Sequence, residues 1–188
     1  MTGNDRATHE HFMRMAISLA ERGTGSVSPN PRVGCVLVKE GKVVGWGYHR
    51  RFGGPHAEVE ALRMAGEEAS GATAYVNLEP CSHFGKTPPC APALAAAGVR
   101  RVVAGMKDPN PRVNGSGLES LQAAGIETVS GVLEKECKWL NRGFVRNMTL
   151  GRPWVTVKAA MSLDGDIALA GGESRWISGP LSRSKAHL

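Results

Sequence analysis

The sequence contains no long apolar run. None of its 188 residues belongs to an apolar segment of the ~20 residues that a membrane-spanning helix requires. The first residues, MTGNDRATHEH, are polar and lack the apolar core of a secretory signal peptide. We therefore expect a cytoplasmic protein with no membrane partner.

Cysteine is also scarce. Four cysteines are too few for a disulfide scaffold in a chain of this length. Cys35, in the apolar run VGCVLV, and Cys137, in EKECKWL, are expected to be buried thiols. Only Cys81 and Cys90 lie in loop or helix-start contexts that suit metal binding.

The chain has no block of basic residues and no basic stripe interleaved with aromatics. Its formal charge of +6 and isoelectric point near 9.4 suit an anionic partner, either a phosphorylated metabolite or nucleic acid, or simply a solvated basic surface. Without a basic stripe, we expect no nucleic-acid partner.

Hydrophobic periodicity predicts an α/β domain over residues 1–148. A hairpin of two strands is expected at 32–49, around the turn EGK. Further strands are expected at 72–79, 99–106 and 126–131, and helices at 8–22, from 56, and at 88–98, 117–125 and 133–145. A hairpin followed by alternating helices and strands predicts three layers with a mixed central sheet whose far half is largely parallel.

This alternation ends at residues 149–188. Gly151-Arg152-Pro153 is typical of a linker, and WVTVKAAMS at 154–162 is expected to form a fresh buried strand. The roughly 38 residues that remain are too few for a lone domain, which usually needs more than ~40. We interpret 149–188 as a linker and the first piece of a second domain.

The stretches HAEVEAL and EPCSHFGKTPPC contain one set of metal-binding residue types. His56, Cys81 and Cys90 are good zinc ligands, and three protein ligands leave a fourth tetrahedral position open. Glu58, two residues after the histidine, could move protons at that position. A helix start at Cys90 should also favour its thiolate.

A histidine followed by a glutamate, or a Pro-Cys pair, is weak evidence by itself. A structural zinc site would normally be closed by a fourth cysteine or histidine, and none is obvious here. The combination of both motifs, in this order with a strand between them, favours zinc-dependent hydrolytic chemistry over a structural metal or no metal.

The order H-x-E, then P-C-x-x-C, resembles the zinc deaminases. Here eight residues, not two, separate the cysteines. With this insertion the chain resembles the bifunctional riboflavin-biosynthesis deaminase/reductase family over nearly its whole length. The motifs that carry the resemblance are SPNPRVGCVLV, HAEVEAL, LEPCSHFGKTPPC, DPNP, LNRGF and KAAMSLDGDIA…GGESRWISGP.

The resemblance implies a cytidine-deaminase-like fold and one zinc ion per chain, held by His56, Cys81 and Cys90. The implied reaction is hydrolytic deamination of 2,5-diamino-6-ribosylamino-4(3H)-pyrimidinone 5′-phosphate to 5-amino-6-(5-phosphoribosylamino)uracil. Glu58 would protonate the ring nitrogen and then the leaving amine.

Several polar residues are candidates for contact with this phosphorylated pyrimidine. The loop between the cysteines offers donors and a cation beside the metal, as a ribose phosphate requires. Asn30 lies in a turn between two prolines, and other candidates follow strands, where α/β domains tend to bind ligands. The predicted substrate-binding residues are Asn30, His49, His83, Lys86, Thr87, Asp108 and Asn110.

Residues 149–188 resemble the start of an NADPH-dependent reductase with a dihydrofolate-reductase-like fold. By this resemblance Ala160 and Trp176 would lie near the nicotinamide cofactor and Ser174 near the substrate sugar. GGESRW is not a dinucleotide-binding fingerprint. We expect NADPH to bind only a complete reductase domain, and no reductase activity from this fragment.

Two other functions remain open. A nucleoside or tRNA deaminase would share the zinc chemistry, although two residues would then be expected between the cysteines. A non-catalytic structural zinc protein would have no use for Glu58. A homo-oligomer is possible, since oligomeric assemblies are common among deaminases.

Overall fold

The computed structural model describes residues 3–84, 88–111 and 113–186. The chain divides into a first compact unit, Met1–Trp154, and a second unit, Val155–Leu188. Within the described residues no helix is both long enough and apolar enough to cross a bilayer. The elements of the first unit are α1 (Gly3–Glu21), β1 (Gly34–Lys39), β2 (Lys42–Tyr48), α2 (Ala57–Ala65), the 3-10 helix η1 (Gly66–Ala69), β3 (Thr73–Val76), α3 (Cys90–Ala96), β4 (Arg101–Ala104), α4 (Ser116–Ala123), β5 (Glu127–Ser130), α5 (Glu134–Leu140) and α6 (Arg142–Leu150).

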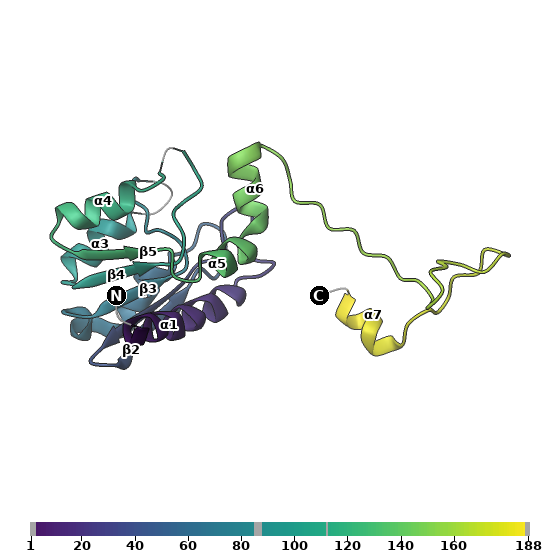
Figure 1. Ribbon diagram of the computed structural model, residues 1–188, viewed down its shortest axis with the longest axis horizontal. Coiled ribbons are helices and arrows are strands. Elements are labelled where there is room, and N and C mark those ends of the chain that lie inside the picture. Colours follow the sequence, from purple (N-terminus) through teal and green to yellow (C-terminus); the bar gives the residue numbers. More distant parts are fainter. Residues whose placement is uncertain (1–2, 85–87, 112, 187–188) are drawn as a thin grey trace. The chain divides into compact units, whose positions relative to one another are not determined.

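The first unit is built on a five-stranded mixed sheet in the order β2-β1-β3-β4-β5. β1 pairs antiparallel with both β2 and β3, whereas β3, β4 and β5 are parallel. Figure 1 shows the labelled strands side by side. The predicted hairpin and the parallel far half are therefore both present.

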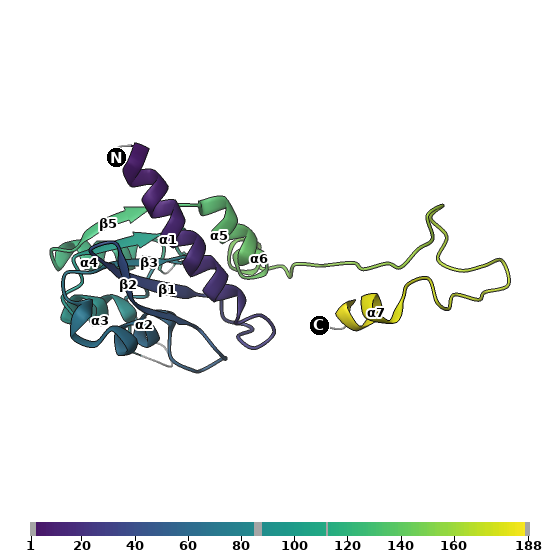
Figure 2. The same ribbon diagram turned by 90° about the horizontal axis from the view of Figure 1, so that it is seen from below.

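Side-chain alternation along the strands produces two hydrophobic cores, one on each face of the sheet. In β1, Cys35 and Leu37 belong to the core under α2, α3 and α4, while Val36 and Val38 belong to the core under α1 and α5. Figure 2 shows α1 on one face of the sheet and α2 and α3 on the other. The fold is the predicted three-layer α/β arrangement.

Two glycines in β2 allow α2 to lie directly against the sheet. A Cβ atom added at Gly47 would lie 2.5 Å from the Ala57 carbonyl oxygen, and one at Gly45 would lie 2.4 Å from the Ala61 carbonyl oxygen. Real Cβ atoms do not approach backbone so closely, so only glycine permits this packing. The position of the α2 N-terminus, which follows His56, depends on it.

The expected single helix over 133–145 is wrong. The chain forms α5 and α6, separated at Asn141, whose backbone departs from helical geometry at φ −100° and ψ 23°. The buried Asn141 side chain instead hydrogen-bonds the backbone N–H and carbonyl of Arg32. This tertiary interaction replaces helical continuity.

The expected buried strand at 154–162 is also wrong. The segment is extended but unpaired among the described residues, and Val155 and Val157 are 74% and 85% exposed. A strand is stable only when a neighbouring strand satisfies its backbone groups. In the second unit the described regular element is the helix α7, Pro180–Ala186.

Candidate functional site

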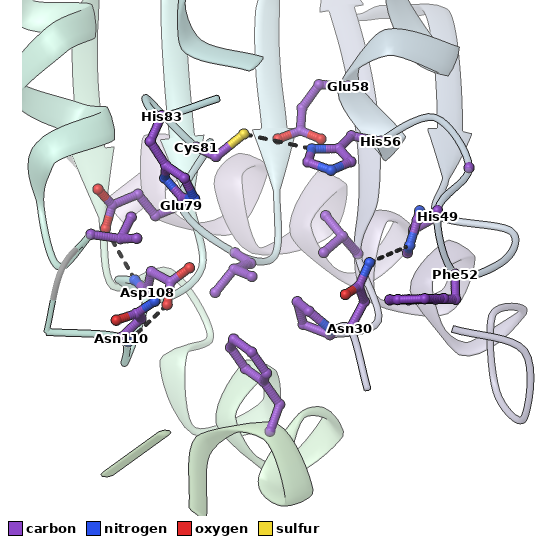
Figure 3. Close-up of a pocket in the computed structure, with 17 residues that line it drawn as sticks. Asn30, His49, Phe52, His56, Glu58, Glu79, Cys81, His83, Asp108 and Asn110 are labelled. Atoms are coloured by element: carbon purple, nitrogen blue, oxygen red, sulfur yellow. Dashed lines mark hydrogen bonds between the residues drawn. The ribbon is translucent and has the colours of Figure 1, made fainter. Parts of the chain in front are cut away.

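The sheet topology brings four strand ends to one edge. Because β1 runs antiparallel to β2 and β3, its start lies beside their ends, and the end of the parallel strand β4 lies next to them. A cavity of about 310 Å³ opens at this edge (Figure 3), within the range of small-ligand sites. Its lining includes Asn30, His49, Phe52, His56, Glu58, Glu79, Cys81, His83, Asp108, Asn110 and Phe144.

His56, Cys81 and Cys90 converge in and beside this cavity. The ligand atoms of the three residues all lie within 4.8 Å of one another. His56 Nδ1 is 3.1 Å from Cys90 Sγ and 3.6 Å from Cys81 Sγ. Nitrogen and sulfur ligands of a tetrahedral zinc ion lie about 3.6 Å apart. The three side chains therefore fit one zinc ion.

The two thiols of this cluster differ in acidity. The pKa of Cys81 is lowered to about 4, first by a hydrogen bond from the Cys90 thiol, and further by His56 and by the Cys90 backbone N–H, which lies 3.3 Å from Cys81 Sγ. The pKa of Cys90 is raised, because its proton is held by Cys81 and because it is buried.

The first amide of α3 is directed at Cys81 Sγ, so the helix start also favours a thiolate at Cys81, and the expected Cys90 thiolate stays a prediction. A bound zinc ion would deprotonate both thiols.

Glu58 is buried in the first turn of α2, beside the metal-binding cluster. Burial raises the pKa of its carboxyl above the ordinary value, and the charge of His56 opposes this shift. Figure 3 shows its carboxylate directed toward the same region as His56 and Cys81. A carboxyl group with a raised pKa holds a proton more readily than an ordinary carboxyl group, which suits general acid–base catalysis.

Asn30 and His49 form a polar pair next to His56, whose ring centre lies 5.8 Å from that of His49. His49 Nδ1 is 2.9 Å from the Pro55 carbonyl oxygen, which only accepts, so Nδ1 carries the proton. His49 Nε2 then accepts the Asn30 amide, 3.1 Å away. The Asn30 oxygen points away from His49 (Figure 3), which leaves an acceptor for a ligand.

Asp108 and Asn110 form another wall, after β4. Asp108 Oδ1 accepts the Asn110 backbone N–H at 2.8 Å, and burial raises the pKa of the Asp108 carboxyl. His83 lines the same cavity from the loop after Cys81. Lys86 and Thr87 lie outside the described residues, so their predicted phosphate contact stays a prediction.

Comparison with known families identifies this site. Residues 6–106 match the family described as the cytidine and deoxycytidylate deaminase zinc-binding region, and this segment contains Glu58 and the metal-binding residues His56, Cys81 and Cys90. The chain belongs to this zinc-binding deaminase family. Residues 153–188 match the RibD C-terminal domain.

Comparison with individual proteins shows which members of the family this chain resembles. The chain is 57% identical to the riboflavin biosynthesis protein RibD of Escherichia coli over 179 residues, which are 95% of this chain and 49% of that protein. It is 47% identical to a solved deaminase/reductase of Thermotoga maritima, named for diaminohydroxyphosphoribosylaminopyrimidine and 5-amino-6-(5-phosphoribosylamino)uracil, with a TM-score of 0.91 over 97% of this chain and 53% of that one.

A third similar structure contains a ligand. The Aspergillus oryzae Rib2 deaminase, solved in complex with DARIPP, is 27% identical and has a TM-score of 0.61 over 75% of this chain and 93% of that one. The chain spans about half the length of the curated bacterial relatives. The predicted resemblance to the riboflavin-biosynthesis deaminase/reductase family is confirmed.

Sequence reasoning missed several residues that build the deaminase site. Asn77, at the end of β3, is fully buried; its Oδ1 accepts the Gly34 N–H at 2.8 Å and its Nδ2 donates to the Arg32 carbonyl at 2.9 Å. Asn141 holds the same Arg32 carbonyl and also accepts the Arg32 N–H. These two amides fix the backbone just after Asn30.

Glu79 and Phe144 were missed as well. Glu79 is a buried acid two residues before Cys81, and Phe144 comes from the LNRGF motif and lines the cavity. An acidic residue shortly after the buried strand β3 was the visible signal for Glu79. Phe144 lies 31 residues beyond Val113, the preceding residue of the cavity lining, and only the fold brings it to the site.

The predicted reductase residues belong to the second unit. Ser174 and Trp176 line a hollow within that unit, and the Arg183 guanidinium lies 3.9 Å from the centre of the Trp176 ring. Ala160 is exposed on the extended segment. Their assignment to a cofactor or sugar site stays a prediction.

Proposed function

We propose that this chain hydrolytically deaminates 2,5-diamino-6-ribosylamino-4(3H)-pyrimidinone 5′-phosphate to 5-amino-6-(5-phosphoribosylamino)uracil in riboflavin biosynthesis. The observation that carries the proposal is the convergence of a zinc ligand set and a buried carboxyl group on one cavity. The name of the Thermotoga maritima relative supports a phosphorylated pyrimidine as the substrate.

In this proposal His56, Cys81 and Cys90 hold one zinc ion. Zinc, when bound, supplies a Lewis acid that activates water for attack on the amino-bearing ring carbon. Glu58 accepts the proton that this water loses and delivers protons to the ring nitrogen and to the leaving amine, which departs as ammonia. Its burial beside the ligands limits competition from bulk water.

The polar walls of the cavity provide the substrate contacts. Asn30 presents an amide oxygen that can accept a hydrogen bond from the pyrimidine edge, and the Asn30–His49 bond keeps that amide in place. Asp108, Asn110 and His83 offer further polar groups from the opposite wall. We assign the ribose phosphate to Lys86 and Thr87 on the long cysteine loop.

The remaining predictions concern the molecule outside this cavity. We propose domains at 1–148 and 149–188, with the second a partial reductase whose Ala160, Trp176 and Ser174 serve NADPH and the sugar only in a complete domain. A cytoplasmic location, the absence of a nucleic-acid partner and a homo-oligomeric state also stay predictions.

Parallel assays of ammonia release test the proposal. The purified zinc-loaded chain is incubated with the diaminopyrimidinone phosphate, cytidine, adenosine and a tRNA substrate. We expect turnover of the first alone. Turnover of a nucleoside or of tRNA would support the alternative deaminases, and no release from any substrate would support a structural zinc protein.

A further inference from the structure

One buried carboxylate connects the metal-binding segment to the opposite wall of the cavity. Glu79 is 3% exposed, and its two oxygens accept four backbone N–H groups. Oε2 accepts those of Asp108 at 3.0 Å and Gly115 at 2.9 Å. Oε1 accepts those of Gly117 at 2.8 Å and Leu118 at 3.4 Å.

Only a carboxylate satisfies this arrangement. Each oxygen faces two donors, and a carboxylate is the side-chain group that accepts on both of its ends. Three of the four donors belong to the N-cap and first turn of α4, where a negative charge is also favoured by the helix dipole. A glutamine would place its NH₂ group against two N–H donors.

The segment after β3 packs tightly against α4 at the same place. A Cβ atom added at Gly117 would lie 1.8 Å from the Pro80 carbonyl oxygen, so the two backbones are in direct contact. Pro80 separates Glu79 from Cys81. Pro80 and Glu79, which directly precede Cys81, therefore contact the N-terminus of α4.

We propose that Glu79 is a positioning residue for substrate binding, which holds Asp108 and Asn110 at a set distance from Cys81. The carboxylate binds the Asp108 backbone, and Asp108 in turn binds the Asn110 backbone, so the orientation of this wall depends on Glu79. The role in substrate binding rests on the proposed deaminase function, whereas the anchoring of the loop does not.

Hydrogen exchange tests the anchoring without any substrate. In Glu79→Gln, the amides of Asp108, Gly115 and Gly117 should exchange at least about 10-fold faster than in the wild type, and zinc content should remain about one per chain. Glu119→Gln is the matched control, because Glu119 is an exposed acid in the first turn of the same helix. Unchanged exchange at Asp108 would overturn the inference whatever the activity.

Kinetics then test the positioning role. We expect Glu79→Gln to raise KM for the diaminopyrimidinone phosphate about 10-fold or more, with a smaller change in kcat. In an Asp108→Ala background the same change should raise KM less than threefold, because the group that it positions is gone. An equal rise in KM in both backgrounds, or an unchanged KM in Glu79→Gln, would refute the positioning role. A wild-type chain without turnover would count against the proposed function alone.

Glu79→Asp covers the case in which Glu79→Gln does not fold. It keeps the charge and both acceptors but shortens the side chain by one methylene. We expect a folded, zinc-loaded protein with faster Asp108 exchange and a raised KM. Wild-type exchange and KM in a folded Glu79→Asp variant would overturn the inference.

Discussion

Asn141 binds both backbone groups of Arg32, although 109 residues separate them in the sequence. Its Oδ1 accepts the Arg32 N–H at 2.8 Å and its Nδ2 donates to the Arg32 carbonyl at 2.9 Å. The side chain thereby joins the α5–α6 junction to the segment that carries Asn30, at the edge of the cavity.

Asn141→Ala should lower the free energy of unfolding by about 1–3 kcal/mol, because the partly buried Arg32 N–H loses its acceptor. Denaturant unfolding of the zinc-loaded protein measures this. Asn147→Ala, at an exposed asparagine of α6, should change stability by less than about 0.5 kcal/mol. Equal stability of the two variants would show that the Arg32 contact contributes little.

The metal-binding cluster should hold about one zinc ion per chain. Cys81→Ser and Cys90→Ser should each lose most of it, because a hydroxyl is a much poorer zinc ligand than a thiolate. Metal analysis after gel filtration gives the stoichiometry. Cys137→Ala is the control, since Cys137 is buried on α5, in the core on the other face of the sheet. Full zinc occupancy in both serine variants would remove the cysteines from the site.

Glu58→Gln should retain zinc and lose turnover. General acid–base catalysis typically contributes ~10²–10⁴-fold, and Glu58 is proposed to serve more than one proton transfer. The expected loss in kcat is therefore at least ~10²-fold, measured by ammonia release alongside the zinc content. Activity close to the wild type with zinc bound would exclude Glu58 from proton transfer.

His9 should make stability depend on pH in mildly acidic solution. It is buried, with Nδ1 3.0 Å from the Tyr75 hydroxyl, and burial, followed by the charge of Arg101, lowers its pKa. His9 binds a proton more readily in the unfolded chain than in the folded protein. Its contribution to the free energy of unfolding is therefore complete above the unfolded pKa of about 6.5 and is lost as pH falls toward the folded pKa.

Unfolding curves at several pH values test this. Between pH 7 and 5, His9→Gln should flatten the fall in stability relative to the wild type by up to about 1.4 kcal/mol per pH unit, the value for one proton. His11→Gln, at an exposed position of α1, should leave the fall unchanged. A His9→Gln profile parallel to that of the wild type would contradict the prediction.

Lys86 should distinguish a phosphorylated substrate from a free nucleoside. If it binds the ribose phosphate, Lys86→Ala removes a charged hydrogen bond worth about 1.5–3 kcal/mol, so kcat/KM should fall at least ~10-fold. Activity on the dephosphorylated compound should barely change, and Lys135→Ala, at an exposed position of α5, should affect neither activity. Equal losses on both substrates would refute a phosphate contact.

The sequence predicted the features that depend on local pattern. Alternation in VGCVLV and the EGK turn predicted the hairpin, and the turn has the positive φ angles that a tight hairpin requires, 51° at Glu40 and 77° at Gly41. The motifs with His56, Cys81 and Cys90 predicted a cluster that the structure brings together.

Features that depend on distant partners were not predictable in this way. The four donors to Glu79 come from Asp108 and from the N-cap and first turn of α4, about 30 to 40 residues downstream, and only the completed fold brings them to one carboxylate. The helix break at Asn141 depends on Arg32. At 154–162 the apolar pattern predicted a strand, but pairing requires a neighbour that the described residues do not supply.

The close packing of α2 on β2 also affects how sequence variants of this protein are interpreted. Gly45 and Gly47 contribute no side chain to the cavity, yet any larger residue there would push away the helix whose first turn carries Glu58 and follows His56. The usual expectation that a glycine in a strand can be replaced by alanine would fail at these two positions. Gly47→Ala would weaken metal binding, although every metal-binding and proton-transferring residue is unchanged.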